Sequence, residues 1–125
     1  MLTQINNEHG FNQFIGNYLT QCHHPLEILV PVTPFEITLI TELMADDEAF
    51  FIPVSGIKAL IINEGEPCLH INGESFVLDN DTKALAQLLA QDFTLTTKDL
   101  NSFKDCLKNV QLLTNVLNKG YWYIE

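Results

Sequence analysis

The sequence predicts an α+β fold with N-terminal helices, a small antiparallel sheet and a C-terminal winged-helix-like domain. Three observations lead to this prediction. Apolar residues recur at helical spacing early in the chain, short β-like runs separated by turn residues fill its middle, and a glycine stops the last helix before an aromatic strand. We expect a helical segment over 1–47, and hairpins with the winged-helix-like domain over 48–125.

The first helix is expected over about residues 7–21, where apolar side chains form one stripe. The stripe consists of Phe11, Phe14, Ile15, Tyr18 and Leu19. Gly16 lies inside this helix, where glycine costs ~1 kcal/mol relative to alanine. Two interpretations of Gly16 stay open, which are the close approach of another backbone and a tolerated weakness or bend.

Residues 25–34 carry three prolines and are expected to form an extended connector. A second helix follows from its start signals. Thr33 is expected to cap it, Pro34 suits its first turn, and Glu36 completes a capping box.

The middle of the chain predicts four short strands, at 49–54, 57–62, 68–71 and 75–78, which together form a small antiparallel meander. Asn72-Gly73 predicts a type I′ turn between the last two strands, because that turn needs positive φ at both central positions. His70 lies on the third strand, and we interpret it as a surface or half-buried residue rather than a metal ligand.

The last third predicts a helix over about 79–90 capped by Asp79 or Asn80, a short extended link, two further helices and a final strand. Thr96 and Asp99 have the spacing of a capping pattern. Leu100, Phe103 and Leu107 are expected to face inward, and the final helix is marked by Val110, Leu113, Val116 and Leu117. Gly120 is expected to end the last helix, and Tyr121, Trp122 and Tyr123 then form the terminal wing strand. Helix, short strand, helix, helix, strand is the order of a winged-helix domain.

The composition of the chain limits the classes of function that we expect. The chain has a net charge of −10 with six lysines and no arginine, so we expect no nucleic-acid binding. Its longest apolar runs are too short for a membrane span, so we expect a cytoplasmic protein with no membrane association. Three widely spaced cysteines predict reduced thiols rather than a disulfide framework.

No catalytic motif stands out in the sequence. None of the four histidines is followed at the second position by a carboxylate, and nucleophile elbows, Walker loops and dinucleotide fingerprints are missing. We therefore expect no catalytic, cofactor-binding or metal-binding residues in this chain, which predicts a non-catalytic module.

Three segments carry a resemblance to a known family: F11-N-Q-F-I-G-N-Y-L-T20, I71-N-G-E74 and N118-K-G-Y-W-Y123. In this order and at nearly these separations they resemble the C-terminal region of bacterial JmjC-type ribosomal oxygenases. These are ribosomal protein arginine hydroxylases of the cupin superfamily. The resemblance covers about residues 11–125.

The resemblance implies an N-terminal barrel that uses Fe(II) and 2-oxoglutarate and is missing here, as in a fragment or truncated product. This chain is therefore expected not to hydroxylate anything. It further implies a homodimer, a winged helix that helps to place a ribosomal protein substrate, and a self-association helix carrying Phe11, Phe14, Gly16 and Tyr18.

Charge suggests how such a module would meet a basic ribosomal protein. Residues 36–74 hold eight carboxylates and one lysine, a net charge of −7, and an acidic surface attracts basic partners over long range. A solvated acidic face without a partner is the simpler interpretation. Two other functions stay open, a free-standing acidic interaction adaptor and a winged-helix transcription regulator.

Overall fold

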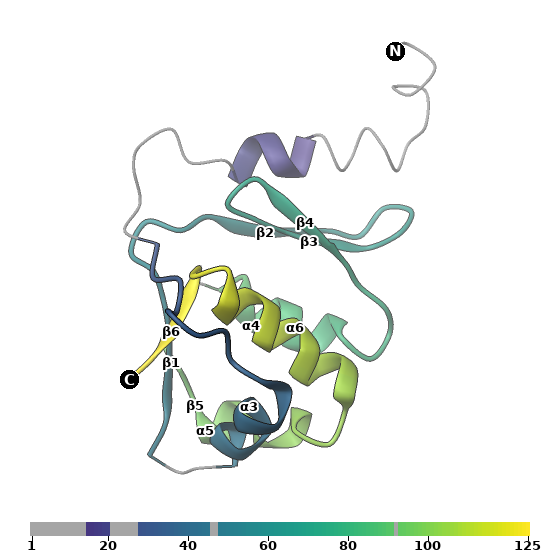
Figure 1. The fold of residues 1–125 in the computed structure, drawn as a ribbon. Helices are drawn as coiled ribbons and strands as arrows, with labels where there is room; N and C mark the ends of the chain where they lie inside the picture. Colours follow the sequence, from purple (N-terminus) through teal and green to yellow (C-terminus); the bar gives the residue numbers. More distant parts are fainter. Residues whose placement is uncertain (1–14, 21–27, 46–47, 92) are drawn as a thin grey trace. The chain divides into compact units, whose positions relative to one another are not determined.

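The computed structural model describes residues 15–20, 28–45, 48–91 and 93–125 (Figure 1). Contacts divide the chain into two units, each built from two separate segments. Unit 1 comprises 1–25 and 57–91, and unit 2 comprises 26–56 and 92–125. The expected division into 1–47 and 48–125 cuts the chain differently and stays a prediction.

Unit 1 is built on a three-stranded antiparallel sheet in the order β2-β3-β4, formed by β2 (Ala59–Ile62), β3 (Cys68–Ile71) and β4 (Glu74–Val77). The tight hairpin between β3 and β4 pairs Ile71 with Glu74. Its two turn residues, Asn72 and Gly73, have φ of 48° and 81°. This confirms the type I′ turn that the Asn-Gly pair predicts.

Among the described residues, two helices belong to the same unit as this sheet. Residues 15–20 are helical, which agrees with the expected first helix, whose other residues lie outside the described part of the chain. The other helix is α4 (Lys83–Leu89), which contacts β2. The carboxylate of Asp79 accepts the N–H groups of Asp81 at 2.9 Å and Thr82 at 3.1 Å, so it closes the turn that leads into α4. The N-cap of α4 itself is Thr82, which makes no side-chain cap hydrogen bond, so the predicted cap by Asp79 or Asn80 lies one turn too early.

Unit 2 contains the winged-helix elements. They are α3 (Ile37–Met44), β1 (Phe50–Pro53), β5 (Leu95–Thr96), α5 (Thr97–Leu100), the 3-10 helix η1 (Asn101–Phe103), α6 (Leu107–Asn118) and β6 (Trp122–Ile124). The strands form an antiparallel sheet in the order β5-β1-β6, and α3 contacts both α5 and α6 (Figure 1). The predicted α+β class with a winged-helix-like domain is confirmed.

The expected four-stranded meander is wrong in one respect, because β1 lies in the sheet of unit 2 and pairs with β5 and β6. Backbone hydrogen bonds join the terminal strand to β1 at both ends. The N–H of Val54 donates to the carbonyl of Tyr121 at 2.9 Å, and the N–H of Glu125 donates to the carbonyl of Phe50 at 2.9 Å. Pro53 ends β1, as its missing N–H predicts. The missing N–H of Pro53 removes no hydrogen bond to β5, because the two residues of β5 pair only with Phe50 and Phe51.

The predicted start of the second helix is also wrong. Helix α3 begins at Ile37, after Glu36 in an extended conformation (φ −89°, ψ 151°), and no side chain caps it. The reason is a distant contact. Asn118 accepts the N–H of Phe35 at 2.7 Å and donates to the carbonyl of Phe35 at 3.2 Å, so the backbone before α3 is held extended.

The helix at 83–89 lies in unit 1, so the prediction that it leads the winged helix is wrong, and α3 supplies that helix instead. The order of elements along the sequence cannot show which helix belongs to the winged helix, since α3 and α4 both precede β5. Thr96 and Asp99 do form a capping box, with the Thr96 N–H donating to Asp99 at 2.9 Å. Leu107 was expected inward but is 60% exposed at the first turn of α6.

Helix α6 ends as the sequence predicts. Gly120 has φ 79°, its N–H donates to Leu117 at 3.0 Å, and the N–H of Tyr121 donates to Val116 at 3.3 Å. These are the two hydrogen bonds of a Schellman motif. A second constraint acts on the same residue: a Cβ added to Gly120 would lie 2.6 Å from the backbone nitrogen of Val30. The chain at 28–30 therefore passes too close for any side chain at position 120.

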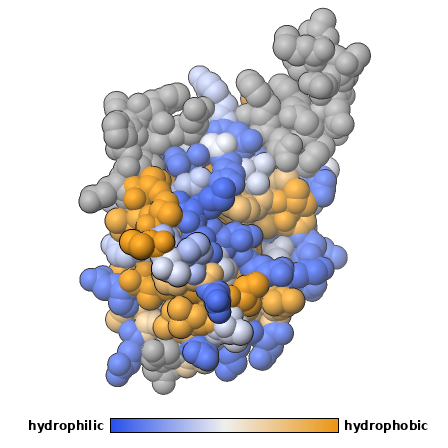
Figure 2. Space-filling view, in the orientation of Figure 1, coloured by the Kyte–Doolittle hydropathy of each residue, from blue (hydrophilic) through white to orange (hydrophobic). Residues whose placement is uncertain are grey.

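Hydrophobic side chains are exposed among hydrophilic ones on the face drawn in Figure 2. The most exposed large apolar residues of the described segments are Val32, Val30, Leu107, Tyr18, Val77 and Leu19. Among the described residues, no helix combines the length and the hydropathy that a bilayer crossing needs.

We expect Gly120→Ala to lower the free energy of unfolding by roughly 2–4 kcal/mol, because it adds left-handed strain and overlap with 28–30. Gly65→Ala is the matched control. Gly65 also has positive φ (68°), but nothing lies within 4 Å of its added Cβ, so only the strain of about 1 kcal/mol remains. Urea unfolding of both variants measures the difference, and equal losses would contradict the crowding at Gly120.

Candidate functional site

A reactive centre is not found in the described part of the chain. No group of three or more His, Cys, Asp or Glu side chains there is arranged to hold a metal ion. Burial, and secondarily the charge of Glu66, raises the pKa of the Cys68 thiol, which keeps this cysteine protonated and unreactive at neutral pH.

The helix at 15–20 is held on the β3–β4 hairpin by polar contacts. Oδ1 of Asn17 lies 2.9 Å from Nδ1 of His70, and the N–H of Gly73 donates to the hydroxyl of Thr20 at 2.9 Å. The same hydroxyl donates to the carbonyl of Gly16 at 2.9 Å. These contacts fix both the position of the helix along the sheet and its rotation about its own axis, and Figure 1 shows it along the β2–β3–β4 sheet.

Gly16 faces the imidazole of His70, and a Cβ at this position would overlap that ring. The close approach considered for Gly16 therefore involves a side chain of the same unit rather than a backbone. His70 is 1% exposed, so its interpretation as a surface or half-buried residue is wrong. It is buried because the helix at 15–20 covers its face of the sheet.

Of the other residues of the expected self-association helix, only Tyr18 lies in the described part of the chain. Phe11 and Phe14 lie outside the described residues. Tyr18 is 58% exposed and its neighbour Leu19 is 53% exposed. The described part of this helix thus presents two large side chains to solvent, beside the glycine that contacts the sheet.

The expected wing strand is docked in unit 2. Trp122 is fully buried and pairs with Pro53, Tyr121 is buried, and Tyr123 is half-buried opposite Ile52. Burying an aromatic side chain of this size stabilises a fold by about 3 kcal/mol. These three residues therefore hold the C-terminal strand in place, which is a structural role.

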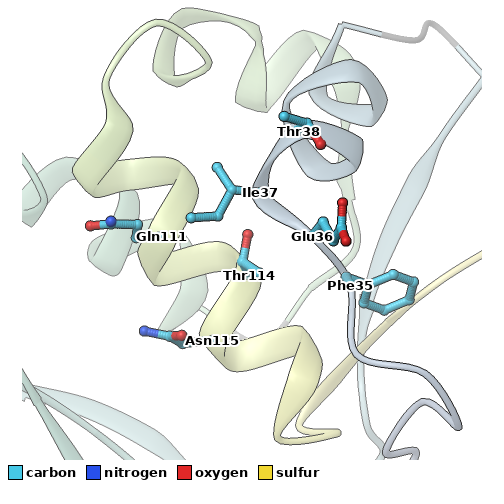
Figure 3. A pocket seen from close by; sticks show the side chains of 7 residues that line it. All are labelled: Phe35, Glu36, Ile37, Thr38, Gln111, Thr114 and Asn115. Carbon is cyan, nitrogen blue, oxygen red and sulfur yellow. The ribbon is translucent and has the colours of Figure 1, made fainter.

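A groove lies in unit 2 between the start of α3 and α6, with a volume of about 560 Å³. Its lining residues are Phe35, Glu36, Ile37, Thr38, Gln111, Thr114 and Asn115 (Figure 3). Ile37 projects from α3 toward α6 in Figure 3, where Gln111 and Asn115 extend from successive turns of α6. We call this the α3–α6 groove. No motif in the sequence marks it, because its walls come from segments more than seventy residues apart.

The acidic stretch expected to attract a basic partner is divided between the two units. Glu36, Glu42 and Glu48 are exposed in unit 2, whereas Glu64 and Glu66 are exposed in the β2–β3 turn of unit 1. The carboxylates that neighbour one another along the chain are thus carried by different folded units. Of these, Glu36 alone lines the α3–α6 groove.

The arrangement of α3, α5 and α6 with the β5-β1-β6 sheet defines a winged-helix protein. More narrowly, the family model described as ROXA-like winged helix matches residues 3–123, so the chain belongs to the ROXA-like winged-helix family.

A curated relative shows where such a domain occurs. The ribosomal protein uL16 3-hydroxylase of Escherichia coli (strain K12) is 26% identical over 125 residues, which are 100% of this chain and 32% of the relative. The chain is homologous to the C-terminal part of that protein, a JmjC ribosomal oxygenase. It spans about one third of the length of the relative.

Solved structures agree with this match. The structure of YcfD, a ribosomal oxygenase from Escherichia coli, in complex with cobalt and succinic acid has a TM-score of 0.82 and 25% identity, covering 100% of this chain and 33% of that chain. The YcfD complex with cobalt and 2-oxoglutarate gives the same values. An X-ray structure of Escherichia coli ycfD has a TM-score of 0.83 and 25% identity, with 100% and 32% covered.

We expect Gly16→Ala to lower the free energy of unfolding by roughly 1–3 kcal/mol, because the new methyl group overlaps the His70 ring. A double-mutant cycle provides the control. In a His70→Ala background the same glycine substitution should cost much less, since the ring is gone. Denaturant unfolding of the four proteins measures the coupling, and an equal cost in both backgrounds would contradict the contact.

Proposed function

We propose that this chain is the non-catalytic C-terminal module of a ribosomal protein arginine hydroxylase that depends on Fe(II) and 2-oxoglutarate. In this proposal the module serves self-association and the placement of a basic ribosomal protein, in the cytoplasm, and holds no catalytic, metal or cofactor residue of its own. The observation that carries the proposal is the alignment of the whole chain with one third of a ribosomal protein hydroxylase.

Charge supports the role in substrate placement. Sixteen carboxylates against six lysines give the chain a negative field, and Glu36, Glu42 and Glu48 are exposed on the unit that carries the winged helix. Ribosomal proteins are basic because they bind RNA. A field of opposite sign raises the rate of encounter and loses its effect as salt screens it.

Exposure supports the role in self-association. Tyr18 and Leu19 are more than half exposed on a helix whose orientation is fixed by Asn17 and Thr20. Large apolar side chains on a rigid helix suit a contact between two copies of a chain, since little conformational entropy is lost when they are buried. We assign the self-association surface to the helix that carries Gly16 and Tyr18, together with Phe11 and Phe14.

We expect the purified chain to bind ribosomal protein uL16, the protein for which the curated relative is named, with an affinity that falls as salt rises. Isothermal titration at several ionic strengths measures this. An acidic protein of similar size is the control and should not bind. Failure to bind uL16 at low salt would contradict the role in substrate placement.

We expect the purified chain to self-associate, and Tyr18→Ser with Leu19→Ser to raise the dissociation constant at least about tenfold, since two large side chains lose an apolar contact. Sedimentation equilibrium measures it. Val77→Ser is the matched control, because Val77 is 56% exposed on β4 of the same unit. A wild-type chain that stays monomeric, or a double variant that associates equally well, would contradict the assignment.

A further inference from the structure

Helix α6 presents a row of amide side chains along one face. With 3.6 residues per turn, positions 111, 115 and 118 fall within an arc of roughly 60°. Gln111 and Asn115 are exposed and Asn118 is half-buried, whereas Val110, Leu113 and most other α6 residues are buried. The three amides therefore line the solvent side of a helix most of whose other residues are buried.

Asn118 shows what an amide in this row does. Its Oδ1 accepts the N–H of Phe35 at 2.7 Å and its Nδ2 donates to the carbonyl of Phe35 at 3.2 Å. Both main-chain hydrogen-bonding groups of Phe35, the residue before the extended Glu36, are thus satisfied by one side chain. The face of α6 already holds one stretch of extended main chain, which belongs to the segment that enters α3.

The α3–α6 groove continues this row. Gln111 and Asn115 line it. The third polar group on this wall is not available as a donor, because the hydroxyl of Thr114 donates to Val110 at 2.7 Å. Two amides with the same donor and acceptor pair as Asn118 therefore border an open groove.

Charged groups flank the amide row on both sides. The exposed carboxylate of Glu36 stands on the α3 wall of the groove. Lys108 in the first turn of α6 and Lys119 at its C-cap lie on the opposite side of the amide row from Thr114. A basic side chain in the groove would therefore meet Glu36.

We propose that the α3–α6 groove binds an extended segment of the basic ribosomal protein, with Gln111 and Asn115 pairing with its main chain and Glu36 with one lysine or arginine side chain. This inference rests on the proposed placement function and names its site. The recognition is of main chain and one charge, so it requires an extended conformation more than a particular sequence.

The test compares variants of the full chain in binding to purified uL16. Gln111→Ala with Asn115→Ala should raise the dissociation constant roughly tenfold, because two hydrogen-bonding amides are lost. Glu36→Gln should raise it several-fold and make binding less dependent on salt. Asn101→Ala, an exposed amide of unit 2 outside the groove, is the control and should bind like wild type.

A second measurement does not depend on substitution. On addition of uL16, the side-chain amide resonances of Gln111 and Asn115 in a nitrogen–proton correlation spectrum should shift or broaden, and that of Asn101 should not. If the double variant binds uL16 as well as wild type and the amide resonances do not shift, the groove is not the binding site. That result would leave the proposed function standing. Absence of wild-type binding would overturn both. Variants that change sedimentation rather than uL16 binding would show that a second copy of the chain occupies the groove.

Discussion

The backbone turn at Gly120 is the constraint on which unit 2 depends. Positive φ at this residue reverses the chain after α6, so that Trp122–Ile124 can pair with β1. The carbonyl of Gly120 then accepts the N–H of Leu29 at 3.0 Å, which ties the segment before α3 to the same point. One residue without a side chain thus joins three parts of the unit: the end of its longest helix, its central strand and the segment that leads into α3.

Polar side chains set the details that apolar burial leaves open. In unit 1, Asn17 and Thr20 fix one rotation of a helix that an apolar stripe alone would allow to turn. In unit 2, Asn118 decides where α3 begins by satisfying the backbone of Phe35. Each of these contacts replaces water at a partly buried backbone or ring atom, so removing one partner would leave the other unsatisfied. The module is consequently specified by a few long-range hydrogen bonds laid over an ordinary apolar core.

Local signals in the sequence were sufficient wherever one residue decides the backbone. Asn72-Gly73, Gly120 and the Thr96–Asp99 pair all behave as their sequence predicts, because their effect lies within a few residues. The sequence failed where a distant partner competes. The capping signals of Thr33, Pro34 and Glu36 did not start α3, because Asn118 binds the backbone of Phe35. Strand β1 pairs with β6 instead of joining the meander. His70 is buried by a helix more than fifty residues earlier in the chain. The α3–α6 groove belongs to the second kind, since neither wall carries a motif and only the fold brings them together.

The two units are interleaved along the chain, and this affects how they can form. Phe51 pairs with Ile124, 73 residues later, and all of 57–91 belongs to the other unit. The β3–β4 hairpin, by contrast, closes across two residues and can form in microseconds. Since closing a long loop delays the contacts that reward it, the hairpin unit can assemble on a growing polypeptide while β1 still lacks its partner. During synthesis, β1 would spend that interval with its hydrogen-bonding edges uncovered, a state that invites chaperone capture or strand exchange between neighbouring nascent chains.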